Sequence, residues 1–62
     1  MTNNEKGLVY DNCLRESDRL QRENSKIKSD YVGNIPQEQQ DILNKNNKRI
    51  SELVKTLENL FN

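Results

Sequence analysis

The sequence predicts an all-α protein: a coiled-coil-like, antiparallel two-helix hairpin that assembles into a helical bundle. Aliphatic residues recur at alternating steps of three and four in two long segments, which is the spacing of a helix with one apolar seam. The turn-forming residues glycine and proline meet once, near the middle of the chain, at 32–36. We therefore expect a single domain, 1–62, with helices at about 3–32 and 36–60 and a loop at about 33–35.

The composition explains why assembly is expected. The chain has 62 residues, of which 31% are hydrophobic and 32% are charged. A chain this short buries a modest fraction of its surface, so its own core is marginal without a metal, a disulfide or a partner.

The first helix is expected to begin after a capping box, because Thr2 and Glu5 have the required N-cap and N3 spacing. Its seam positions, a and d of the heptad repeat, carry mixed residues. These are Tyr10, Cys13, Ser17, Leu20, Asn24, Ile27 and Tyr31.

The turn and the second helix follow from local chemistry. Gly33 can adopt the left-handed conformation that closes a helix. Asn34 and Gln37 have capping-box spacing, and Pro36 suits a first helical turn. The seam of the second helix is more apolar, and it consists of Gln39, Leu43, Asn46, Ile50, Leu53, Leu57 and Leu60.

Folding the chain at residue 35 sets one seam against the other. Leu20 then faces Ile50, and the two seam asparagines, Asn24 and Asn46, face each other. We interpret this pair as a register mark, because a buried polar pair fixes alignment at some cost in stability. Surface hydration of a weak polar layer is the alternative.

The positions beside the seam give two further pairs. On the side formed by the e positions, Gly7 faces Phe61, so the glycine is expected to make room for the ring. On the side formed by the g positions, Glu23 is expected to pair with Arg49.

Catalytic chemistry is not predicted. The chain has no histidine, and its one cysteine, Cys13, occupies a seam position typical of a small buried hydrophobe. Glu38 and Asp41 are explained by the dipole at the start of the second helix. We therefore expect no catalytic residue, no metal and no cofactor.

A single cysteine, the lack of a signal peptide and the lack of a long apolar run favour a cytoplasmic protein without a membrane partner. Ten asparagines hint at a small protein of a bacterium or phage.

The apolar stripe is broad near the two termini and narrow near the loop. Two helices cannot cover a broad stripe, so several residues are expected to contact a protein partner or a second copy. They are Leu14, Val54, Leu57, Leu60 and Phe61. The predicted function is that of a non-enzymatic adaptor or regulator that binds through this face.

Two alternatives stay open. A belt of basic residues at mid-height could contact RNA or DNA phosphates, although the net charge is zero and a solvated helix face explains it as well. The belt consists of Arg19, Arg22, Lys26, Lys45, Lys48 and Arg49. The second alternative is a structural subunit that folds only within a larger assembly.

Overall fold

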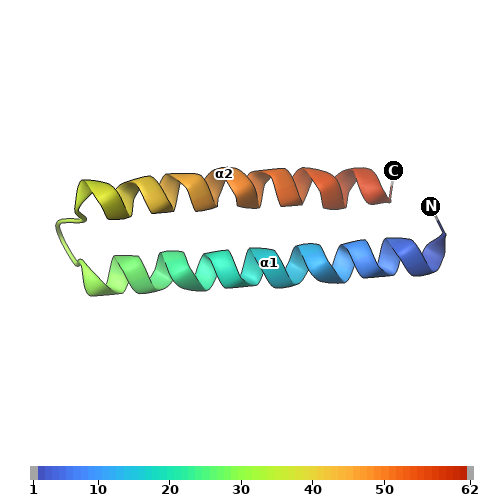
Figure 1. Ribbon diagram of the computed structural model, residues 1–62, viewed down its shortest axis with the longest axis horizontal. Coiled ribbons are helices and arrows are strands. Elements are labelled where there is room, and N and C mark those ends of the chain that lie inside the picture. Colours follow the sequence, from blue (N-terminus) through green and yellow to red (C-terminus); the bar gives the residue numbers. More distant parts are fainter. Residues whose placement is uncertain (1, 62) are drawn as a thin grey trace.

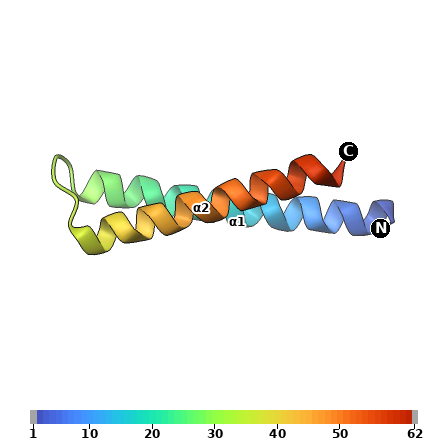
Figure 2. The ribbon, with the colours of Figure 1, turned by 90° about the horizontal axis from the view of Figure 1, so that it is seen from above.

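The computed structural model describes residues 2–61 and confirms the helical hairpin. Helix α1 spans Asn3–Asp30, helix α2 spans Gln37–Leu60, and both described ends of the chain lie at the same end of the hairpin (Figure 1). The helices lie side by side and antiparallel, and they cross at a shallow angle when seen from above (Figure 2). A shallow crossing is the geometry in which two heptad seams stay in contact along their length.

The start of α1 is capped by the Thr2 side chain, which is the N-cap half of the predicted capping box. Thr2 Oγ1 accepts a hydrogen bond of 3.1 Å from the backbone N–H of Glu5, and Thr2 O accepts one of 2.9 Å from Lys6 N–H. The first bond provides a partner for one of the backbone donors that the first helical turn leaves free.

The turn is longer than predicted, because α1 ends at Asp30 and α2 begins at Gln37. Gly33 has φ of +89°, which confirms the positive φ expected of the glycine. The expected capping box of Asn34 and Gln37 is wrong: Pro36 is the N-cap residue, and no side chain caps the helix. Pro36 is extended, with ψ of 151°, so Asn34 lies outside the first turn. Gln37 Nε2 instead donates to Asp41 Oδ1 at 2.8 Å.

The core is a thin strip along the seam, and Leu53 is its most buried residue, with 3% of its surface exposed. Leu53 packs with Cys13 and Leu20, so Cys13 is buried as the sequence predicts. Val9, Ile50 and Leu57 cover the edges of this cluster, while Ile27 and Leu43 are buried nearer the turn. Among the described residues, no side chain is fully buried. Two helices alone therefore leave even their best-packed residues in some contact with water.

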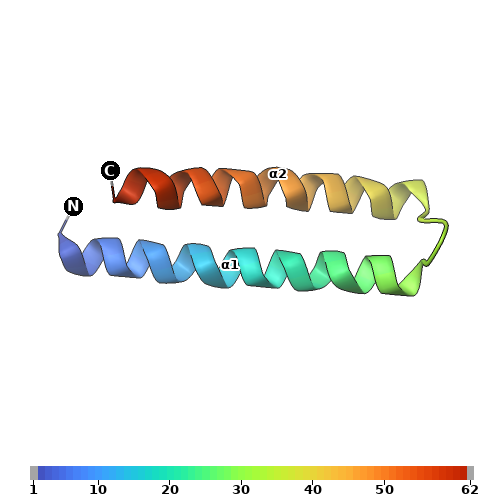
Figure 3. The same ribbon diagram turned by 180° about the vertical axis from the view of Figure 1, so that it is seen from behind.

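The hairpin is a rod of 46 × 14 × 14 Å, measured on its Cα atoms. The front view (Figure 1) and the view from behind (Figure 3) show that no other segment covers either side of the helix pair in the described part of the chain. The two flanks of the seam, one formed by e positions and one by g positions, are therefore the surfaces on which a function can be placed.

Candidate functional site

A polar layer crosses the hairpin near its middle. Asn46 Nδ2 donates to Asn24 Oδ1 at 2.9 Å, and both asparagines are buried. The facing of these two seam residues confirms the predicted alignment of the helices. Their role in fixing that alignment stays a prediction.

The layer is wider than the sequence pattern indicated. Asn46 Nδ2 also donates to Glu23 Oε1 at 2.6 Å, and Asn24 Nδ2 donates to Asn47 Oδ1 at 3.0 Å. Among the described residues, no buried side-chain nitrogen or oxygen atom lacks a partner. Satisfied buried amides avoid the desolvation penalty that unpaired ones incur, so this layer is compatible with a folded core.

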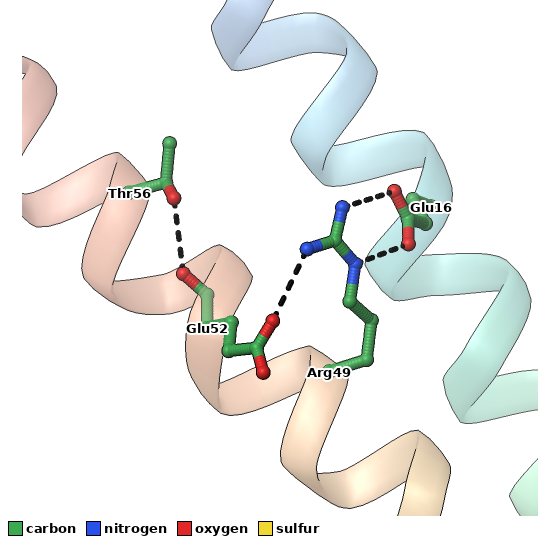
Figure 4. A network of polar contacts seen from close by, with 4 residues as sticks. All are labelled: Glu16, Arg49, Glu52 and Thr56. Carbon is green, nitrogen blue, oxygen red and sulfur yellow. Dashed lines mark hydrogen bonds and ion pairs between the residues drawn. The ribbon is translucent and has the colours of Figure 1, made fainter.

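The g face, which we define by Glu16, Glu23, Ile42 and Arg49, carries an ion-pair network (Figure 4). Arg49 Nε lies 2.7 Å from Glu16 Oε2, and Arg49 Nη2 donates to Glu16 Oε1 at 3.2 Å. Arg49 Nη1 lies 3.3 Å from Glu52 Oε2, while Thr56 Oγ1 donates to the backbone oxygen of Glu52. The two-pronged geometry makes this the most directional charge contact between the helices.

The predicted pair of Glu23 with Arg49 is wrong. Arg49 instead binds Glu16, which lies one heptad nearer the termini on α1. The Glu23 carboxylate accepts from Asn46 in the polar layer.

The hydrogen bonds from Arg49 lower the pKa of the Glu16 carboxyl below its ordinary value of 4.5. A carboxyl whose pKa is lower in the folded state stabilises the fold above its unfolded pKa, and this contribution is lost as the pH falls through the folded pKa. We therefore expect the free energy of unfolding to fall as the pH is lowered from neutral to below about 4.5. The fall should be smaller in Glu16→Gln.

Urea unfolding followed by circular dichroism at several pH values checks this expectation. Glu58→Gln is the matched control, because it removes an exposed carboxylate outside the Arg49 network. An acid drop that Glu16→Gln and Glu58→Gln change equally would mean that the Glu16 pair does not carry the effect.

Two arginines of the basic belt are compensated by carboxylates. Arg22 pairs with Asp18 at 3.0 Å and Arg49 pairs with Glu16 and Glu52. The other four belt residues are exposed and make no ion pair within residues 2–61: Arg19, Lys26, Lys45 and Lys48. Several belt residues line an open groove along the g face, together with Glu16, Glu23 and Glu52. The groove therefore presents mixed charge.

The e face is defined by Gly7, Leu14, Gln21 and Lys28 of α1 and by Gln40, Asn47, Val54 and Phe61 of α2. Its terminal half is apolar and open: Leu14 is 42% exposed, Val54 44% and Phe61 65%. Leu57 and Leu60, also predicted as contact residues, are half-buried in the seam, and Leu57 packs against the core. Of the five predicted residues, the structure thus leaves three substantially uncovered.

Tyr10 joins this apolar half, although sequence spacing placed it in the seam. Its ring meets the Phe61 ring edge-on, with 5.8 Å between the centroids. The expected role of Gly7 is wrong, because a Cβ atom at Gly7 would meet nothing within 4 Å. Phe61 packs on the neighbouring tyrosine rather than over the glycine.

Neither helix described by the structure is long and apolar enough to cross a membrane. Within residues 2–61, no group of three or more potential ligand side chains is placed to hold a metal ion. Comparison with protein-family models, curated proteins and solved structures finds no match for the chain. The case for function therefore depends on the surface of the hairpin itself.

Proposed function

We propose that this chain is a non-enzymatic protein-interaction module that acts by burying the terminal half of its e face against another helical surface. The observation that carries the proposal is the exposure of Leu14, Val54 and Phe61 together on one side of one end of the rod. Apolar side chains gathered on one face favour association, because their burial removes hydrocarbon from water.

The surroundings of this patch suit a partner of mixed or neutral charge. Asp11 beside it is paired with Arg15 at 3.1 Å, and Asp18 is paired with Arg22. Their charges are compensated on the same helix, so they add little repulsion toward an approaching surface. Exposed pairs of this kind contribute little stability, which leaves them free to adjust at the rim of an interface.

The reactive groups of the chain support a non-enzymatic role. Cys13 is buried in the core, and the carboxyl with a lowered pKa, Glu16, is held in an ion pair. An ion pair explains such a pKa without a catalytic role. Nucleic-acid binding is the weaker candidate, because two of the three belt arginines, Arg22 and Arg49, already bind carboxylates and the adjoining groove carries both signs of charge.

Site-specific photo-crosslinking in the cells that express the chain tests the proposal. Val54→p-benzoyl-phenylalanine places the probe on the apolar patch, and Ile42→p-benzoyl-phenylalanine places it at similar exposure on the g face. We expect a discrete protein adduct from position 54 and a much weaker one, or none, from position 42. Equal adducts from both positions, or none from position 54, would refute the assignment of this face.

A further inference from the structure

The e face changes character along its length. Toward the termini it presents Leu14, Val54 and Phe61, whereas toward the turn it presents Gln21, Lys28, Gln40 and Asn47. Any occupant that covers the whole face must therefore be apolar at one end and polar at the other. The face itself has this property, so it can match a second copy of itself.

The exposed area of the hairpin is large enough for an interface with a second copy. A compact monomer of 7.3 kDa exposes about 4200 Å², whereas this hairpin exposes 4972 Å². The excess of about 800 Å² equals the area that a standard protein–protein interface removes from each partner, also about 800 Å². The hairpin thus exposes more surface than a compact monomer of its mass, and its core lacks any fully buried side chain among the described residues.

We propose that a second copy of this chain covers the e face along its full length, with the turns of both copies at the same end. This inference rests on the proposed function and names the partner. The two copies form a four-helix bundle about a twofold axis that runs parallel to the rods. Each α1 then lies against the partner's α2, and neighbouring helices are antiparallel throughout.

The distribution of side chains selects this orientation. With the turns together, Leu14 approaches Val54 of the partner subunit, and the polar half meets the polar half. With the turns at opposite ends and full overlap, Leu14 and Val54 would lie against the polar half, which carries Lys28. That arrangement would set Lys28 against apolar side chains, which offer its ammonium group no hydrogen-bond acceptor, and it would leave the apolar patch unmatched. An overlap of the terminal halves alone would cover the apolar patch but leave the half of the e face near the turn in water.

Charge does not oppose the pairing of identical chains. Ten basic and ten acidic residues give a net charge of zero, so two copies do not repel each other as whole molecules. In the proposed orientation Lys28 lies across from Gln40 of the partner subunit, so the one charged residue of the e face meets a neutral side chain.

Sedimentation equilibrium of matched variants tests the face. We expect the unmodified chain and Ile42→Asp to have twice the 7.3 kDa chain mass. We expect Val54→Asp to raise the dissociation constant of the dimer at least about tenfold, because the substitution buries a charge on each copy. Ile42 is 37% exposed on the g face and is therefore a close match for Val54. Phe61→Asp provides a second variant at the exposed end of the chain, where loss of folding is a smaller risk.

The outcomes separate this inference from the proposed function. A wild-type chain that stays at 7.3 kDa at every concentration overturns the second copy, while a photo-adduct of position 54 with another polypeptide would still support the interaction face. If the dimer stays intact in Val54→Asp and in Phe61→Asp, the e face is not the interaction surface, and both this inference and the proposed function are overturned. Circular dichroism of each variant shows that helices remain.

Distances between spin labels test the orientation. Asn34→Cys in a Cys13→Ser background places one nitroxide at the exposed turn of each copy. Turns at the same end predict a distance between the two labels well below the 46 Å length of the rod. A distance near or above 46 Å would overturn the orientation, and dilution with unlabelled chain, which must abolish the dipolar signal, shows that the distance joins two copies.

Discussion

Leu53→Ala is expected to unfold the protein at moderate temperature. Leu53 is the most buried residue of the hairpin, and it packs against Cys13 and Leu20 from the opposite helix. Removal of a buried leucine side chain costs about 2–5 kcal/mol. A core of this size rarely supplies more than about 3–5 kcal/mol, so one such change consumes most of the stability.

Thermal unfolding by circular dichroism at fixed chain concentration measures this effect. Ile42→Ala is the control, because it removes a similar side chain from the same helix at a position that is 37% exposed. We expect a large fall in melting temperature, or no folded baseline, for Leu53→Ala and a small fall for Ile42→Ala. Equal falls would show that the Cys13–Leu20–Leu53 cluster is not the centre of the core.

The asparagine layer is expected to respond in opposite directions to single and double substitution. Asn46→Ala removes the donor to Asn24 Oδ1 and to Glu23 Oε1. The buried Asn24 oxygen then lacks a partner, so stability falls by about 1–3 kcal/mol. In Asn24→Leu with Asn46→Leu, both amides are replaced by hydrocarbon, and the melting temperature should rise. The same double variant should lose uniqueness of alignment or of oligomeric state, because nothing polar then marks the register.

Melting curves and solution mass decide the role of the layer. A double leucine variant with unchanged stability and a single unchanged oligomeric state would contradict a role in register. A rise in melting temperature accompanied by mixed oligomers would support it. The single Asn46→Ala variant shows whether the hydrogen bonds of the layer are intact in solution.

The alignment of the helices could be predicted because several local signals agreed. Gly33 and Pro36 placed the turn without reference to the seams, and folding there brought Asn24 opposite Asn46. The structure confirms that pairing with a 2.9 Å hydrogen bond. Agreement between turn chemistry and apolar periodicity is typical of a chain with one favoured alignment.

Side-chain partners beside the seam could not be predicted in the same way. Heptad spacing placed Glu23 opposite Arg49, but the arginine binds Glu16, one heptad nearer the termini, while Glu23 accepts from Asn46. The pairing of Tyr10 with Phe61 depends on how the last turn of α2 ends, which spacing does not determine. The Asn34 cap failed because Pro36 holds an extended backbone just before the helix.

The mass and helicity of the unmodified chain across a concentration series test the account most directly. We expect a species of twice the 7.3 kDa chain mass, with helix content that falls as dilution separates the copies. Marginal helix content at every concentration would instead indicate a chain that folds only within a larger assembly. A fully helical species of 7.3 kDa, unchanged by concentration, would contradict the proposal that a second copy completes this fold.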